Sequence, residues 1–242
     1  GYEAGQNLGS SGDTMLGYQA GQNMTGDFNA VVGYQAGQDL TGFYNTASGY
    51  QAGQNLSGNA NDVTGFRAGQ SLSGFNNTAF GSYAGQNLSG NANDLQGVSA
   101  GRNLSGFNNT ATGSFAGQNL SGSRNNVTGY AAGQYLSGTD NTVSGFFAGR
   151  NLSGYGNVVN GRRAGENLTG DNVIATGVNA GQSLIGDDNI VSGENAGQRL
   201  SGSGNIASGR DAGQSRRGSD KRVAPQTARV PLAGGDALTG RT

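Results

Sequence analysis

The chain has 242 residues, a formal net charge of −1, and no cysteine, histidine or tryptophan. It therefore lacks the usual zinc ligands, the commonest general base near neutral pH and the basic excess that holds nucleic acid. No apolar run approaches the roughly 20 residues of a membrane helix, and no signal peptide is visible. We expect no metal, no cofactor, no catalytic residues, no nucleic-acid partner and no membrane-spanning segment.

Residues 1–224 consist of fourteen consecutive sixteen-residue repeats without insertion or deletion. We number the repeats 1 to 14 and the positions within each repeat 1 to 16. Gly occupies positions 1 and 5 and Ala occupies position 4 in every repeat, and Gly occupies position 10 in all but the first. This periodicity indicates a backbone requirement rather than a flexible linker. The chain begins at Gly1, on a repeat boundary and without a Met, which suggests a mature product or an excerpt of a longer array.

A period of sixteen residues is too short for the two-helix repeats and suits one coil of a β-solenoid. Gly at positions 1, 5 and 10 and Asn at position 13 are turn formers because they tolerate positive φ, and short strands are expected between them. We therefore predict an all-β fold, a parallel β-roll of fourteen coils over residues 1–224. Residues 225–242 depart from the pattern and are expected to be an irregular tail or linker.

Three positions of each repeat supply the predicted core: Ala at position 4, Leu at position 8 in twelve repeats, and an apolar residue at position 15 in all of them. Burial in one coil yields about 3–5 kcal/mol, whereas ordering sixteen residues costs on the order of 16–30 kcal/mol. The coils must therefore stack at roughly 4.8 Å, into a rod of about 65 Å. Because this core is thin, we expect a second surface to be buried against other copies. The predicted core includes Ala52, Leu56, Val63, Ala68, Leu72, Ala79, Leu88 and Leu95.

Amide side chains recur at two further positions, Gln at position 6 and Asn at position 13, each in 11 of the repeats. We expect both rows to face outward and to form ladders in which identical amides hydrogen-bond from coil to coil. A role in satisfying turns and strand edges is favoured over ligand binding. The predicted ladder residues include Gln54, Gln70, Gln86, Asn61, Asn77 and Asn93.

The aromatic residues, nine Tyr and nine Phe, all lie at or before Tyr155, mostly at positions 2 and 3 or 11 and 12. Adjacent strand residues point to opposite faces, so rings at positions 2 and 3 are expected on opposite faces. Rows of rings favour a subunit interface, and a partner-binding surface or simple strand propensity are the alternatives. The expected interface or binding rows contain Tyr18, Tyr34, Tyr50, Phe66, Tyr83, Phe115, Tyr130, Phe146 and Phe147.

Charge gathers toward the C-terminal end, since residues 1–96 carry seven charged side chains and residues 145–224 carry sixteen. In the last repeat, residues 209–224, Arg replaces the core Leu and Lys replaces the Asn of position 13. We interpret this repeat as a degenerate charged cap that stops further stacking. Its marker residues are Arg216, Arg217 and Lys221.

The unit from Asn141 to Ala148, with the pattern N-x-[VA]-x-G-x-x-A, resembles the head repeat of the YadA-type trimeric autotransporter adhesins. It is also similar to repeats in some phage tail fibres, and the resemblance extends over all fourteen coils. The resemblance implies a left-handed parallel β-roll and three chains side by side. It also implies display on a bacterial surface and binding to host matrix or to other cells.

We therefore expect a non-enzymatic, extracellular or cell-surface adhesive rod that self-associates laterally as a homotrimer. Its partners would be itself and a host matrix protein, a glycan or another cell surface. The main alternative is a subunit of a filament or matrix that polymerises end to end. An ice-binding rod would need a regular Thr array, which position 9 lacks. A glycan-cleaving solenoid would need acidic residues that break the repeat and cluster in the middle of the rod. The nearest breaks of the repeat are Arg150, Arg162, Arg163 and Glu166, of which only one is acidic.

Overall fold

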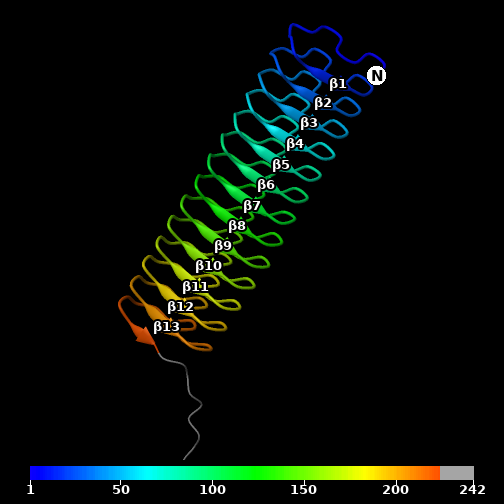
Figure 1. The fold of residues 1–242 in the computed structure, drawn as a ribbon. Coiled ribbons are helices and arrows are strands. Elements are labelled where there is room, and N and C mark those ends of the chain that lie inside the picture. Colours follow the sequence, from blue (N-terminus) through cyan, green and yellow to red (C-terminus); the bar gives the residue numbers. More distant parts are fainter. Residues whose placement is uncertain (224–242) are drawn as a thin grey trace, which may run out of the picture.

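The computed structural model describes residues 1–223, which form a straight rod of stacked coils (Figure 1). Each repeat contributes one short strand at positions 14 to 16, and all the strands pair in parallel and in sequence order within one sheet. The predicted all-β parallel solenoid is confirmed, while the tail at 225–242 lies outside the described residues. The strands are β1 (Thr14–Leu16), β2 (Ala30–Val32), β3 (Thr46–Ser48), β4 (Asp62–Thr64), β5 (Thr78–Phe80), β6 (Asp94–Gln96), β7 (Thr110–Thr112), β8 (Asn126–Thr128), β9 (Thr142–Ser144), β10 (Val158–Asn160), β11 (Ile174–Thr176), β12 (Ile190–Ser192), β13 (Ile206–Ser208) and β14 (Arg222–Val223).

The register places every residue directly beneath its equivalent in the next repeat, as Val63 beneath Ala79. A second line of parallel bridges runs along position 9, for example between Ser57 and Ser73. Backbone hydrogen bonds between coils also continue through the turns, where the N–H of Gly53 donates to the carbonyl of Ala68 at 2.9 Å. The coils are therefore joined around their whole circumference, which explains how strands of only three residues can build a rod.

Tight corners come from backbone in the left-handed region, which every coil enters at positions 3, 7 and 12. The residue there carries a side chain in every coil, except that position 12 is Gly12, Gly156 or Gly204 in three of them. In the fourth coil these are Gln51 (φ 51°), Asn55 (φ 56°) and Ala60 (φ 55°). Glycine is required at position 10 for a different reason. A Cβ on Gly90, for example, would overlap the carbonyl oxygen of Gly106 in the next coil. Only glycine lets neighbouring coils approach this closely.

The core is one continuous column in which, from the second coil to the thirteenth, Ala of position 4, the Leu or Met of position 8 and the apolar residue of position 15 are buried. In the first coil Leu8 is 38% exposed, and Met15 and Val223 at the two ends of the column are partly buried. All eight residues that represent the predicted core lie in it, none more than 1% exposed. The Asn residues of position 13 are buried beside this column, none more than 1% exposed. The prediction that they face outward is wrong, and so is their assignment to positive φ, because they lead into the strand with ordinary φ values.

Candidate interaction surface

The buried Asn row forms a ladder that ties the corner before each strand to its neighbours. The Nδ2 and backbone N–H of Asn77 both donate to Oδ1 of Asn61, each at 3.0 Å, and Asn93 repeats the arrangement on Asn77 at 2.9 and 3.0 Å. The second Nδ2 hydrogen of Asn77 reaches the carbonyl of Gly90 at 2.8 Å. Each amide is buried and its donors and acceptor are occupied by neighbouring coils, so this row stabilises the fold and offers nothing to a ligand.

The Gln row of position 6 forms a second, half-buried ladder. Nε2 of Gln70 donates to Oε1 of Gln54 at 2.7 Å, and Gln86 donates to Gln70 at 2.8 Å. At the tenth and eleventh coils the amides are replaced by an ion pair, in which Arg150 contacts Glu166 at 2.7 Å, and Gln182 then bonds to this carboxylate at 3.0 Å. From Arg150 to Gln182 the contacts between coils are therefore made by a charged pair in place of two amides.

Two more polar ladders lie at positions 3 and 7, and sequence reasoning missed them. Gln35 donates to Gln19 at 2.9 Å and Gln51 donates to Gln35 at 2.9 Å, while exposed Asn pairs such as Asn87 and Asn103 bond at 3.0 Å. The signal was present in the sequence as identical amides at a fixed repeat position.

Beside the position 3 amides runs a row of exposed aromatic rings, which we call the ring ladder. Its members are stacked in parallel, with centroids 5.0 to 5.5 Å apart and interplanar angles of 4 to 10°. Four of the five rings are 40–42% exposed. The ring faces contact one another, so the edges point to solvent. The ring ladder consists of Tyr2, Tyr18, Tyr34, Tyr50 and Phe66.

Charged groups border the ring ladder at both ends. The guanidinium of Arg67 lies 5.4 Å from the centre of the Phe66 ring and bonds to Gln51 at 2.9 Å, which is a cation–π contact at the last ring. At the other end, burial in the stack and then the carboxylate of Glu3 raise the pKa of Tyr18 above its usual value. The neutral phenol is thus favoured within the stack.

The expectation that rings at positions 2 and 3 lie on opposite faces is wrong. Phe66 and Tyr83 meet edge to face at 5.3 Å, and Phe146 and Phe147 meet at 4.3 Å. The reason is the left-handed backbone of position 3, which breaks the alternation of an extended strand. Left-handed backbone is costly for bulky residues, so the rings at position 3 carry a conformational strain that Gly or Asn would avoid.

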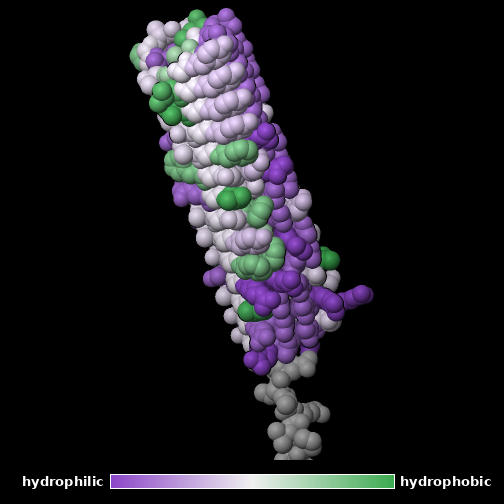
Figure 2. Space-filling model, turned by 90° about the vertical axis from the view of Figure 1, so that its right-hand side faces the viewer, coloured by the Kyte–Doolittle hydropathy of each residue, from purple (hydrophilic) through white to green (hydrophobic). Residues whose placement is uncertain are grey.

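A second group of rings on the same edge occupies coils 8 to 10. Tyr130 contacts Phe115 at 5.7 Å, Phe146 at 5.3 Å and Phe147 at 5.7 Å. Figure 2 shows this edge, with pale and hydrophobic side chains toward the N-terminal end and strongly hydrophilic ones toward the C-terminal end. Arg216, Arg217 and Lys221 of the last coil are all exposed.

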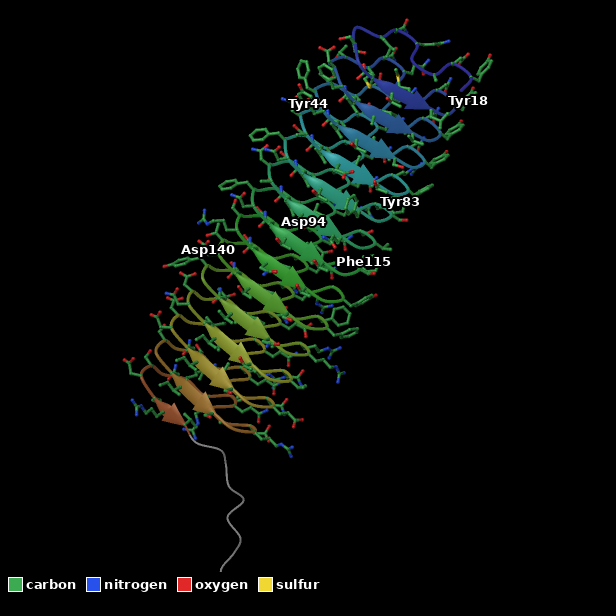
Figure 3. The ribbon with its side chains drawn as sticks, viewed as in Figure 1. Tyr18, Tyr44, Tyr83, Asp94, Phe115 and Asp140 are labelled. Atoms are coloured by element: carbon green, nitrogen blue, oxygen red, sulfur yellow. The ribbon has the colours of Figure 1, made fainter. Side chains whose placement is uncertain are left out.

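The opposite edge carries the rings of positions 11 and 12. Figure 3 shows Tyr18, Tyr83 and Phe115 along one edge of the rod and Tyr44 and Asp140 along the other. Phe28 and Tyr44 stack there at 5.3 Å, whereas Phe43, Phe75 and Phe107 project singly. The predicted interface rows, all at positions 2 and 3, therefore lie on one edge, and the rings of positions 11 and 12 form a separate one.

No protein-family model matches the chain, and no match is found among curated proteins. Within the residues that the structure describes there is no pocket, and no group of acidic side chains is arranged to hold a metal ion. Over residues 1–223, no helix is long and apolar enough to cross a membrane. The candidate site is accordingly a surface, made of two aromatic edges on a rigid rod.

Proposed function

We propose that this chain is a non-enzymatic structural and adhesive rod that works outside the cell or on its surface. Copies of the rod associate laterally through the ring ladder. The observation that carries the proposal is the exposure of five rings in one unbroken stack along one edge. Contiguous exposed apolar surface of this kind is typical of interfaces with other proteins.

Two properties make the ring ladder suitable as an interface. The rings are already ordered by stacking, so little side-chain entropy is lost when a partner covers their edges. Their spacing of about 5 Å per coil gives a straight strip of roughly 20 Å, which another rod of the same rise can cover along its length. The hydroxyl groups of the Tyr residues and the neighbouring amides of Gln19, Gln35 and Gln51 supply the polar rim of such a contact.

The number of chains in the assembly follows from the resemblance of the repeat to the head of trimeric adhesins. Three rods would place their ring ladders around a common axis and leave the remaining surfaces free for adhesion.

The oligomeric part of the proposal is tested by light scattering and sedimentation of the chain and of the double variant Tyr34→Ser and Tyr50→Ser. At the lowest concentrations at which it assembles, before trimers meet through their other edges, the chain should show one discrete mass near three copies, and the double variant should dissociate at concentrations at least tenfold higher. The matched control is Tyr135→Ser, which removes an exposed Tyr outside the ladder and should leave the mass unchanged. A wild-type chain that stays monomeric at high concentration would contradict lateral association.

The adhesive part needs a separate measurement on the same samples. Immobilised collagen and immobilised chitin serve as a protein probe and a glycan probe, with bovine albumin as the blank surface. Retention of the wild-type rod on either probe above the blank supports adhesion, and equal retention on all three surfaces contradicts it.

A further inference from the structure

The edge opposite the ring ladder follows a period of two coils rather than one. Over coils 3 to 7, position 11 alternates between Phe and Asn, while position 15 alternates between Ala and a larger apolar residue. The alternation at the surface is thus matched by one in the core. At position 11 the residues are Phe43, Asn59, Phe75, Asn91 and Phe107, and at position 15 they are Ala47, Val63, Ala79, Leu95 and Ala111.

The Phe residues of this edge project as three separate teeth, Phe43, Phe75 and Phe107, and are 45%, 51% and 47% exposed. Between these rings, at Asn59 and Asn91 of coils 4 and 6, lie two gaps lined by shorter side chains, which we call the notches. Oδ1 of Asn59 accepts a hydrogen bond from the backbone N–H of Phe43 at 3.0 Å, and Asn91 does the same for Phe75. These amides are held against the backbone of the preceding coil, so they do not fill the space between the rings. The adjoining residues in the notches are the small, exposed Ala60 and Ala92.

The notches have the width of one aromatic ring. Teeth two coils apart are separated by roughly 9.6 Å, so a ring placed midway lies about 4.8 Å from each. Rings one coil apart in this protein stack at similar distances, 5.3 Å for Phe28 and Tyr44 on this same edge and 5.0 Å for Tyr34 and Tyr50 on the other. The row of teeth is therefore half of a stacked ladder, with every second ring missing.

We propose that a second copy of this chain supplies the missing rings, with the two rods antiparallel. A partner must present apolar rings at a two-coil spacing on a rod of the same rise, and this chain presents them itself. A parallel pair related by a two-fold axis would set tooth against tooth at the same level. A two-fold axis perpendicular to the rods interleaves the teeth and closes the assembly at two chains.

The favoured register places the axis between the Phe75 rings of the two chains. The partner's Phe107 then enters the notch over Ala60, and the partner's Phe75 enters the notch over Ala92. The partner's Phe43 comes to lie over the eighth coil, beside the guanidinium of Arg124, where it adds a cation–π contact. The result is one stack of six rings, three from each chain, on the edge opposite the ring ladder. The pairing does not depend on lateral association through that ladder.

Variants that fill the notches distinguish pairing by interleaved rings from nonspecific association of apolar surfaces. We would measure the dimer dissociation constant by sedimentation, in the Tyr34→Ser and Tyr50→Ser background so that the ring ladder does not contribute. The double variant Asn59→Phe and Asn91→Phe completes the ladder within each chain and should weaken pairing at least tenfold, although it adds apolar surface. Phe75→Ser should weaken pairing to a similar extent. Unchanged or tighter pairing of the notch-filled variant would overturn the proposal.

Cysteine cross-linking tests the orientation, because the chain contains no cysteine of its own. With a mild oxidant, Asn76→Cys lies near the proposed axis and should form a disulfide-linked dimer by itself. Asn108→Cys should not do so alone, but should cross-link to Ala60→Cys when the two variants are mixed. Cross-linking of Asn76→Cys and Asn108→Cys each on its own would indicate a parallel pair, and cross-linking of none would exclude pairing through this edge. Either result contradicts the proposal.

Discussion

Asn125 donates both its backbone N–H and its Nδ2 to the side-chain oxygen of Asn109, each at 3.0 Å, within the buried corner of the rod. The same amide donates to the carbonyl of Gly138 at 2.9 Å and accepts from Asn141. One side chain thus serves three successive coils. Such a residue couples the stacking of neighbours more strongly than a core methyl group does, because several buried polar groups lose their partners when it is removed.

Replacing this amide should therefore be costly. We expect Asn125→Ala to lower the free energy of unfolding by about 3–5 kcal/mol, because it leaves buried donors of Asn141 and the carbonyl of Gly138 unpaired. The neighbouring residue provides the control, since Asn126 is exposed in strand β8, and Asn126→Ala should change stability by less than about 0.5 kcal/mol. Urea denaturation monitored by far-UV circular dichroism measures both. Equal effects at the two positions would show that burial of the ladder does not matter.

Exchanging Gly for Ala at residue 90 and Ala for Gly at residue 92 should change the stability of the rod in opposite directions. Gly90→Ala introduces a Cβ that overlaps the Gly106 carbonyl, so it should destabilise the rod by more than about 3 kcal/mol. Ala92 holds a φ of 55°, and Ala92→Gly should stabilise by about 0.5–1 kcal/mol because glycine reaches this region without strain. Thermal unfolding of the two variants gives the comparison. A destabilised Ala92→Gly would indicate that the exposed methyl makes contacts worth more than the strain it causes.

The ion pair of Arg150 and Glu166 should be replaceable by the amides that it interrupts. Arg150→Gln alone leaves the Glu166 carboxylate, whose side chain is 8% exposed, without its 2.7 Å partner. We expect a loss of about 1–3 kcal/mol, below the cost for a fully buried pair because Arg150 is over a third exposed. The double variant Arg150→Gln and Glu166→Gln restores the ladder and should come within about 1 kcal/mol of the wild type. A double-mutant cycle by urea denaturation checks this, and additive losses would contradict it.

The pair of Arg124 and Asp140 should make stability depend weakly on acid pH. A hydrogen bond from Arg124 at 2.6 Å, together with its charge, lowers the pKa of Asp140 below the usual value. The pair therefore contributes stability above the unfolded pKa of about 3.9, and this contribution is lost as pH falls through the folded pKa. Asp140→Asn should be slightly less stable than the wild type at pH 7, and the difference should be smaller at pH 2. Denaturation at the two pH values, repeated at high salt to screen the pair, measures the gap. A stability difference of the same size at pH 2 would show that the effect of Asp140→Asn comes from packing and not from the charge pair.

Much of this architecture can be predicted from the repeat. Residues that recur every sixteen positions must fall into register when the coils stack, so the column of Leu56 and Leu72, and the contact of Gln54 with Gln70, follow from spacing alone. The place of the strand within the repeat, and the inward direction of its position 15 side chain, recur with the same period. The inference needs no knowledge of the corner conformations, because identical corners superimpose whatever their shape.

The backbone conformation at each corner determines which way the side chains there point, and the repeat pattern by itself did not give that direction. Asn61 lies inside rather than outside, because the buried backbone before the strand needs an amide to satisfy it. Phe146 and Phe147 lie together rather than apart, because left-handed backbone at position 3 turns both side chains to the same edge. The repeat therefore determined the coil, its core and its ladders. Only the tertiary structure separated the ring ladder from the teeth of Phe43, Phe75 and Phe107, because the direction of a side chain at a corner depends on dihedral angles that periodicity does not specify.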